Sequence, residues 1–200
     1  MTTVLLTTLF SYLLGSMAFA VIISQLMGLP DPRSFGSKNP GATNMLRGGN
    51  KKAALLVLLG DALKGLLAVW LTQRYAVPIN GQMWLAEVAA IAVFVGHGYP
   101  VFFGFKGGKG VATALGILLA LNPLLGLLTF ASWLIVMLLS RISSLSALTA
   151  LLVGPIMSLW LTEDRIQRWT ILLIALMLLI HHHSNIRKLL SGKETVFKKP

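Results

Sequence analysis

The sequence predicts an all-α integral membrane protein with seven transmembrane helices, an external N-terminus and a cytoplasmic C-terminus. Two observations predict this class. Of the 200 residues, 56% are hydrophobic and only 12% are charged, and the mean hydropathy is +0.78. A soluble domain carries about 25% charged residues and cannot bury so much apolar surface. The apolar residues also gather into runs of about 20, the length a helix needs to cross a bilayer.

Seven apolar segments are candidates for these spans. The first, residues 4–29, contains no charged residue. It has no basic leading region and is longer than the apolar core of a cleavable signal, so we expect it to be a retained span. We expect a single polytopic domain over residues 1–200 with a short basic tail at residues 187–200. The other candidate spans are residues 53–72, 83–99, 111–121, 124–139, 145–161 and 169–180.

The apolar region from residue 111 to residue 139 is too long for a single span. As one helix its 29 residues would extend about 43 Å, well beyond a hydrocarbon core of about 30 Å. Asn122-Pro123 in its middle is typical of a turn, and we therefore divide it into two helices. The first of them is only about 16 Å long, so it recruits residues 107–110 or ends inside the bundle.

The positions of Lys and Arg favour seven spans over six. Cytoplasmic segments of membrane proteins are enriched in these two residues. With seven spans, 13 of the 17 basic residues lie on the side of the C-terminus and three on the other side, whereas six spans divide them nine to seven. This places the C-terminus in the cytoplasm. We expect Lys198 and Lys199 in the tail to anchor lipid headgroups and help to fix the topology.

Net charge and cysteine content exclude several chemistries. The net charge of +11 on a membrane protein indicates a basic cytoplasmic face and anionic ligands, and we expect no nucleic-acid partner. The chain has no cysteine, which excludes disulfides, thiolate nucleophiles and thiolate metal ligands. The three consecutive histidines 181–183 point about 100° apart on a helix. They cannot all bind one metal ion, and no metal or cofactor is expected.

Residues 36–47 form a first polar loop, GSKNPGATNMLR. Small hydroxyl and amide side chains, two glycines and two cations precede a predicted helix. Glycine lets the backbone approach a ligand closely and a helix start adds partial positive charge, which together can hold an anion. A polar turn with a helix cap explains the same residues equally well. The candidates in this loop are Ser37, Asn39, Gly41, Thr43, Asn44 and Arg47.

Residues 105–113 form a second loop, FKGGKGVAT, which opens directly into a predicted helix. Three glycines in four residues with a lysine between them resemble a phosphate nest with a point charge. The spacing differs from that of a Walker A loop, so ATP or GTP is not indicated. Close helix packing would explain Gly107 and Gly108 but not Lys109. The candidates here are Lys106, Gly107, Gly108, Lys109 and Gly110.

Further polar residues stand at or within the predicted spans. His182 and Asn185, three apart at the end of the last span, can face one site, although snorkelling at the interface would also explain such residues. Ser144 would alone be part of a helix cap. Within the second span, Asp61 and Lys64 are three apart, and we expect them to neutralise each other as a structural pair. We expect Glu87 and His97 near the two ends of the third span, with Glu87 at the interface.

All four polar clusters, including the serines at 143–146, fall on the cytoplasmic side of the predicted topology. A rim of cations, glycines and hydroxyls below an apolar bundle suits a small anion from the cytosol together with a hydrophobic chain from the bilayer. The residues alone therefore indicate a membrane enzyme or transporter that handles phosphate and lipid.

Three motifs narrow this further: GSKNPGATNxxR at residues 36–47, FFGFKGGKGVAT at residues 102–113, and HHxNI at residues 182–186 with Gly192 and Glu194. They resemble the bacterial acyl-phosphate:glycerol-3-phosphate acyltransferase family, PlsY, over nearly the whole chain. The resemblance implies transfer of a fatty acyl group from acyl phosphate to the sn-1 hydroxyl of glycerol 3-phosphate. The products are lysophosphatidic acid and phosphate, at the start of phospholipid synthesis in the bacterial inner membrane, with the active site facing the cytoplasm.

The resemblance also implies roles for residues. The family usually has arginine where this sequence has His181. The predicted partners are glycerol 3-phosphate, acyl phosphate and membrane lipids, and we expect a monomer. The catalytic candidates are Ser37, Arg47, Lys109, His182 and Asn185. The substrate- and phosphate-binding candidates are Asn39, Gly41, Thr43, Asn44, Lys106, Gly107, Gly108, Gly110 and Ser144.

The predicted chemistry needs no covalent acyl-enzyme. Acyl phosphate is already activated, so the protein mainly positions two anions and stabilises developing charge. The chain has neither cysteine nor a GxSxG elbow, which agrees with direct transfer. His182 either acts as the general base or only positions substrate while a donor phosphate oxygen takes the proton.

The alternative function is transport of an anionic, phosphate-containing solute. A transporter of this kind requires charged residues at the bilayer midplane. The sequence places only Asp61 and Lys64 there, and these two can pair.

Overall fold

The structure, a computed structural model, describes residues 1–197. These residues form helices joined by loops, and none of them lies in a β-strand. The all-α prediction is therefore confirmed. The prediction for Lys198 and Lys199 concerns residues outside the described part. The chain divides into two compact units, Met1–Leu121 and a second unit that starts at Asn122.

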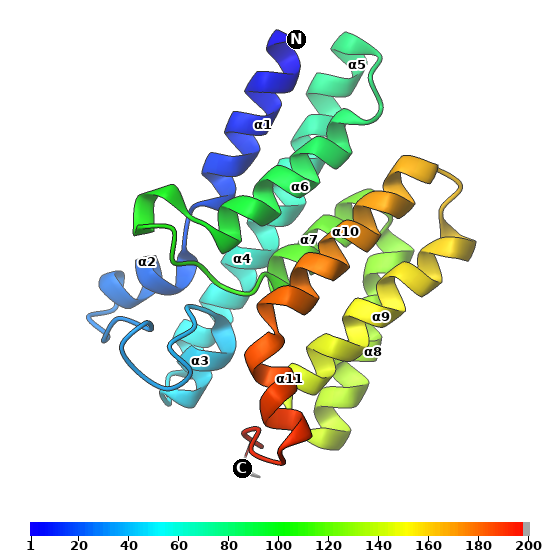
Figure 1. Cartoon of the computed structure of the whole chain (residues 1–200). Helices are drawn as coiled ribbons and strands as arrows, with labels where there is room; N and C mark the ends of the chain where they lie inside the picture. The colour runs from blue at the N-terminus through cyan, green and yellow to red at the C-terminus, as the bar shows by residue number, and fades with distance from the viewer. Residues whose placement is uncertain (198–200) are drawn as a thin grey trace. The chain divides into compact units, whose positions relative to one another are not determined.

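The first unit is built on two pairs of packed helices. α1 runs beside α6, and α4 runs beside α7 (Figure 1). A π-helical turn η1 and the short α5 continue α4, so that residues 51–79 form one apolar helix. The helices of this unit are α1 (Thr2–Gly15), α2 (Phe19–Leu26), α3 (Ala42–Arg47), α4 (Lys51–Leu71), η1 (Thr72–Ala76), α5 (Val77–Asn80), α6 (Leu85–Gly98), the 3-10 turn η2 (Val101–Phe103) and α7 (Val111–Leu121).

Glycines allow these pairs to pack backbone against backbone. A Cβ atom on Gly15 of α1 would lie 2.2 Å from the carbonyl oxygen of Val93 in α6. A Cβ atom on Gly116 of α7 would lie 1.9 Å from the carbonyl oxygen of Ala62 in α4. Small residues at such contacts are typical of helices packed within membranes. The short α7 is thus held closely against the much longer α4.

The second unit is a helical layer in which α9 packs against both α8 and α10. Its first helix follows the predicted turn: α7 ends at Leu121 and Pro123 opens α8, while the Asn122 side chain accepts from the amide of Leu125 at 3.0 Å. The turn at Asn122-Pro123 is therefore confirmed. The helices of this unit are α8 (Pro123–Ser140), α9 (Ser143–Leu161), α10 (Arg165–His181) and α11 (His183–Leu190).

Four helices of the described chain are long and apolar enough to cross a membrane: Lys51–Ile79, Leu85–Phe103, Pro123–Ser140 and Ser143–Leu161. The number rises to six if each of two bent pairs is one span. These pairs are α1 with α2, bent by 46°, and α10 with α11, bent by 60°. α7 has only 11 residues. Seven spans stay a prediction.

One local prediction differs from the structure. The first predicted span, residues 4–29, is broken between Gly15 and Phe19. Glu87 is buried in the first turn of α6, with 6% of its surface exposed, and its place near the membrane interface stays a prediction. It is buried because α6 is covered by both α1 and α4, so even its first turn is enclosed.

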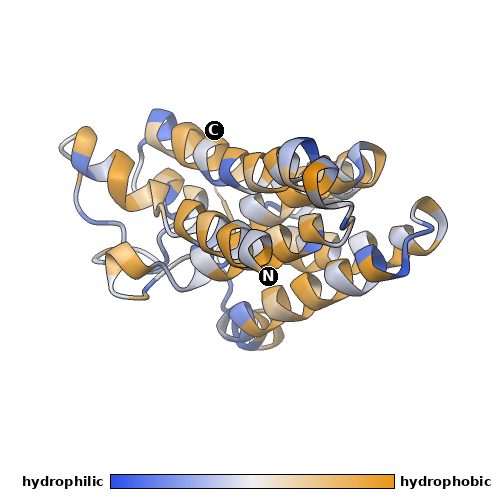
Figure 2. Cartoon of the chain, turned by 90° about the horizontal axis from the view of Figure 1, so that it is seen from above, coloured by the Kyte–Doolittle hydropathy of each residue, from blue (hydrophilic) through white to orange (hydrophobic). Residues whose placement is uncertain are grey.

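The surface suits a lipid environment. Large apolar side chains such as Leu5, Leu139 and Trp160 are 68%, 81% and 71% exposed. Figure 2 shows that the helices are hydrophobic over most of their length, with hydrophilic residues mainly in loops and at helix ends. In water such a surface would be an aggregation hazard, whereas lipid tails cover it at no cost.

Candidate anion-binding site

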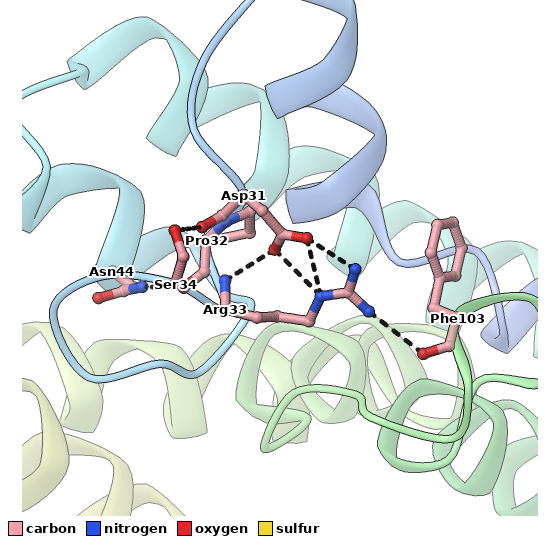
Figure 3. Close-up of polar contacts among 6 residues, drawn as sticks. All are labelled: Asp31, Pro32, Arg33, Ser34, Asn44 and Phe103. Atoms are coloured by element: carbon pink, nitrogen blue, oxygen red, sulfur yellow. Dashed lines mark hydrogen bonds and ion pairs between the residues drawn. The ribbon is translucent and has the colours of Figure 1, made fainter.

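The first polar loop is shaped around the side chain of Asn44, which is 1% exposed in α3. Its Oδ1 accepts from the amide of Ser37 at 2.9 Å. Its Nδ2 donates to the carbonyl of Pro32 at 2.7 Å (Figure 3) and to that of Phe35 at 3.2 Å. Gly36, in the left-handed region with φ +56°, passes so close that a Cβ would lie 2.3 Å from Oδ1. Asn44 therefore fixes where Ser37 stands.

Arg33, just before this loop, links it to the second motif through a hydrogen bond. The guanidinium of Arg33 donates to both oxygens of Asp31, at 2.7 Å from Nη2 and 3.0 Å from Nε, and its Nη1 donates to the carbonyl of Phe103 at 3.2 Å (Figure 3). The hydrogen bonds from Arg33 hold the pKa of Asp31 below its usual range. The side chains are 31% and 41% exposed, so the pair stabilises the fold by less than about 1 kcal/mol. The pair holds the Arg33 guanidinium in place for its hydrogen bond to Phe103, and that bond connects the two segments.

The glycines of the second loop hold it against the end of α6. The amides of Gly107 and Gly108 donate to the carbonyls of Gly98 and His97, each at 3.2 Å. A Cβ on Gly107 would lie 2.0 Å from the His97 carbonyl. The close-packing role considered from the sequence is therefore present at these two glycines. Any phosphate contact in this loop falls mainly to the residues that follow them.

Gly108 is also where the two loops meet. A Cβ there would lie 3.0 Å from the carbonyl oxygen of Pro40 in the first loop. Residues 36–47 and 102–113 thus lie side by side within the first unit, although they are distant in the sequence. Lys109 and Gly110 follow immediately and lead into α7, whose first amides have no partner within the helix and carry partial positive charge.

The exposure of the candidates fits a site that opens at the loops. The exposed candidates are Ser37 and Lys106. Arg47, in the last turn of α3, is partly buried. Gly110 is buried. Partly buried as well are Asn39, Gly41, Thr43, Gly107, Gly108 and Lys109.

The remaining candidates, His182, Asn185 and Ser144, belong to the second unit. His182 stands at the bend between α10 and α11 and is 2% exposed. Its Nδ1 lies 2.8 Å from the carbonyl of Leu178. Because a carbonyl only accepts, Nδ1 carries the proton of the neutral ring, and Nε2 is the nitrogen with a lone pair.

Asn185 is held by the chain that follows it. Its Nδ2 donates to Oε2 of Glu194 at 2.9 Å, and Gly192, with φ +66°, turns the chain back after α11. Ser144 is buried in the first turn of α9, a helix that contacts α11. Glu194 belongs to the third motif, where the sequence indicated no role for it. The structure shows that it holds the side chain of Asn185.

Sequence reasoning assigned no role to Asp31 or Arg33. The only signal is their spacing of two, which permits a local ion pair, whereas the contact with Phe103 is 70 residues away. Among residues 1–197 no group of three or more histidines, cysteines or carboxylates is placed to hold a metal ion.

Apolar helices suited to lipid and two adjacent loops rich in glycine, hydroxyls and cations define an integral membrane protein with a candidate anion-binding site. The sequence model of the glycerol-3-phosphate acyltransferase family matches residues 5–192, and the chain belongs to that family. The glycerol-3-phosphate acyltransferases of Burkholderia pseudomallei (strain 1710b) and Paraburkholderia phymatum are 57% and 53% identical to it over 194 and 191 residues. These alignments cover 96% of this chain and 94% and 91% of the relatives.

Two crystal structures of PlsY (YgiH), an integral membrane glycerol 3-phosphate acyltransferase, have a similar fold. The glycerol 3-phosphate form matches with a TM-score of 0.90 and 38% identity, over 98% of this chain and 96% of that one. The lysophosphatidic acid form matches with a TM-score of 0.88 and 37% identity, over 98% and 95%. The resemblance drawn from the three motifs is confirmed, and the chain is a membrane acyltransferase.

Proposed function

We propose that this protein transfers a fatty acyl group from acyl phosphate to the sn-1 hydroxyl of glycerol 3-phosphate. Acylation of glycerol 3-phosphate in phospholipid synthesis is the activity of its family. The bound forms of the related crystal structures, glycerol 3-phosphate and lysophosphatidic acid, are the acceptor and the product of this reaction. The observation that carries the proposal is the meeting of residues 36–47 with residues 102–113 at Gly108.

In this proposal the first unit binds the phosphate groups. Lys109 supplies a point charge, the start of α7 supplies amides with partial positive charge, and Arg47 supplies a second cation. Ser37 and Thr43 add hydroxyl donors, and Asn39 orients the substrate. Asn44 acts through the loop, because its donors and its acceptor are bonded to loop backbone. Such a site positions two reactants and stabilises developing charge, which is what transfer from an activated donor requires.

The proposed proton acceptor is a histidine. We assign this role to Nε2 of His182, since Nδ1 is bonded to the Leu178 carbonyl and keeps the ring oriented. The hydroxyl of glycerol 3-phosphate loses its proton as its oxygen attacks the acyl carbonyl, and the bond to the phosphate oxygen breaks. Asn185, fixed by Glu194, orients the substrate, and Ser144 binds it.

We further propose the topology predicted from the charges: seven membrane segments in one polytopic domain, an external N-terminus and loops that face the cytoplasm of a bacterial inner membrane. α7, about 16 Å long, would count as a short segment in this scheme. We expect the protein to act as a monomer among membrane lipids and without a cofactor.

The test is acyl transfer by the purified protein in detergent, where no gradient exists. With acyl phosphate and glycerol 3-phosphate present, the proposal expects equal amounts of phosphate and lysophosphatidic acid. Lys109→Ala should lower kcat/KM by about 100-fold, the usual effect of losing one charge-stabilising donor, while Lys193→Ala in the exposed tail should not. A wild-type protein that binds both substrates but forms no lysolipid would favour the transporter alternative.

A further inference from the structure

A buried ionic network lies in the first unit, beneath the two loops. Asp61 and Lys64 of α4 are 3% and 1% exposed and form an ion pair at 3.0 Å. The predicted pairing is confirmed, but Lys64 does more than neutralise Asp61. Its Nζ also donates to the carbonyls of Gly15 at 2.9 Å and Met17 at 2.8 Å, where α1 ends and the chain bends into α2. Lys64 therefore fixes the break between these two helices.

The network continues from Asp61 to His97 near the end of α6. His97 is 7% exposed. Its Nδ1 lies 3.5 Å from Oδ1 of Asp61 and 3.1 Å from the hydroxyl oxygen of Thr113 in α7. The carboxylate and the hydroxyl both approach the same ring nitrogen, Nδ1, and these two contacts orient the imidazole ring. A pair that served only to cancel two buried charges would have no need of this third member.

His97 touches the second loop on both sides of Lys109. Before the lysine, its carbonyl accepts the amide of Gly108 at 3.2 Å, and its Nε2 would be 2.4 Å from a Cβ on Gly108. After the lysine, its ring meets Thr113 in the first turn of α7. Gly108 is the direct neighbour of Lys109, and only the three residues 110–112 separate Lys109 from Thr113. Lys109 therefore stands between two points of contact with His97.

We infer that His97 is a positioning residue for Lys109, and that the Asp61–Lys64 pair acts by fixing the His97 ring. The inference rests on the proposed function, because it assumes that Lys109 binds a phosphate group. In this inference the buried charges have a functional role. The network connects the bend between α1 and α2, through α4 and α6, to the loop that contains Lys109. Misplacing a binding group by about 1 Å can cost about 100-fold in rate.

A double-mutant cycle between His97 and Lys109 tests this directly. We expect His97→Ala to lower kcat/KM by about 10- to 100-fold and to alter the same substrate's KM as Lys109→Ala does. Combining the two substitutions should cost no more than about 3-fold beyond Lys109→Ala alone, since residues that act as a unit are not additive. A merely structural role would multiply the two losses and leave both KM values unchanged. That result would overturn the inference.

If His97→Ala does not fold, two more conservative variants at Thr113 test the same inference. Thr113→Val keeps the shape of the side chain but removes the hydroxyl, whereas Thr113→Ser keeps the hydroxyl. We expect about a 10-fold loss of kcat/KM in the first and rescue in the second. Thr72→Val is the matched control. The Thr72 hydroxyl donates to the Ala68 carbonyl of the same helix at 2.8 Å, so its removal should leave the protein active.

The outcomes separate the inference from the proposed function. Wild-type protein without acyl transfer, or full activity in Lys109→Ala, would refute the function and with it the assumption. A large loss in Lys109→Ala together with normal kcat/KM in Thr113→Val and His97→Ala would leave the function standing and refute the positioning role.

Discussion

Replacing Gly116 with alanine should move α7, the helix that follows the proposed anion site. A Cβ at this position would lie 1.9 Å from the carbonyl oxygen of Ala62 and 2.9 Å from the amide nitrogen of Leu66, both backbone atoms of α4. Ordinary contact begins at about 3.4 Å, so α7 has to retreat from α4 by about 1.5 Å. α7 starts two residues after Lys109, and a helix moves nearly as a rigid body. The displacement therefore reaches the site.

The expected effects are a loss of stability and a larger loss of activity. Overpacking of this kind costs about 1–3 kcal/mol. A displacement of more than about 1 Å should lower kcat/KM by about 100-fold. Initial rates of phosphate release at several concentrations of glycerol 3-phosphate measure the activity. The fluorescence of the five tryptophans during heating in detergent measures the stability.

Gly28→Ala is the matched control for this experiment. Gly28 has φ +63° and no atom within 4 Å of the place of a Cβ. Alanine there costs about 1–2 kcal/mol through the left-handed backbone, with nothing displaced. It should lower the melting temperature as Gly116→Ala does but keep normal kcat/KM. Normal kcat/KM in Gly116→Ala, or equal losses in both variants, would refute the packing argument.

Three further predictions concern the loops and the base. Asn44→Asp removes two donors to the carbonyls of Pro32 and Phe35, and unpaired buried groups cost about 1–3 kcal/mol each, so both melting temperature and kcat/KM should fall. Asp31→Asn should lower the melting temperature slightly at neutral pH. Because the pKa of Asp31 is lowered in the fold, its stabilisation is present above the unfolded pKa of about 4 and is lost as the pH falls through the lowered value; a difference from wild type that grows as the pH falls below about 4 would contradict this. His182→Ala should lower kcat by about 100-fold or more without changing KM; a small change in kcat with a raised KM would show that His182 only positions substrate.

Local sequence features predicted much of the architecture. Apolar runs located most of the helices, because a helix within a membrane must be apolar over its length. Asn122-Pro123 located a turn, since both of its determinants, the side-chain cap and the proline, are local. The spacing of Asp61 and Lys64 located an ion pair for the same reason.

Features that depend on distant contacts were not predictable in this way. The break after Gly15 is held by Lys64, 49 residues away, and nothing in residues 4–29 reveals it. Gly107 and Gly108 bind carbonyls of α6, and their amides could have been assigned to a phosphate from the sequence alone. Composition and spacing named the candidate residues as a group, whereas the packing of α4, α6 and α7 decides what the candidates in the second loop contact.

In the proposed function, two loops of the first unit form one anion site on the cytoplasmic side. The protein contains no cysteine, so Lys38→Cys and Lys106→Cys each introduce a single thiol in the exposed part of one loop. A membrane-impermeant thiol reagent should label both in inverted vesicles and neither in right-side-out vesicles, and glycerol 3-phosphate or inorganic phosphate should slow both reactions. Labelling from opposite sides, or no protection of either thiol by these anions, would contradict the claim.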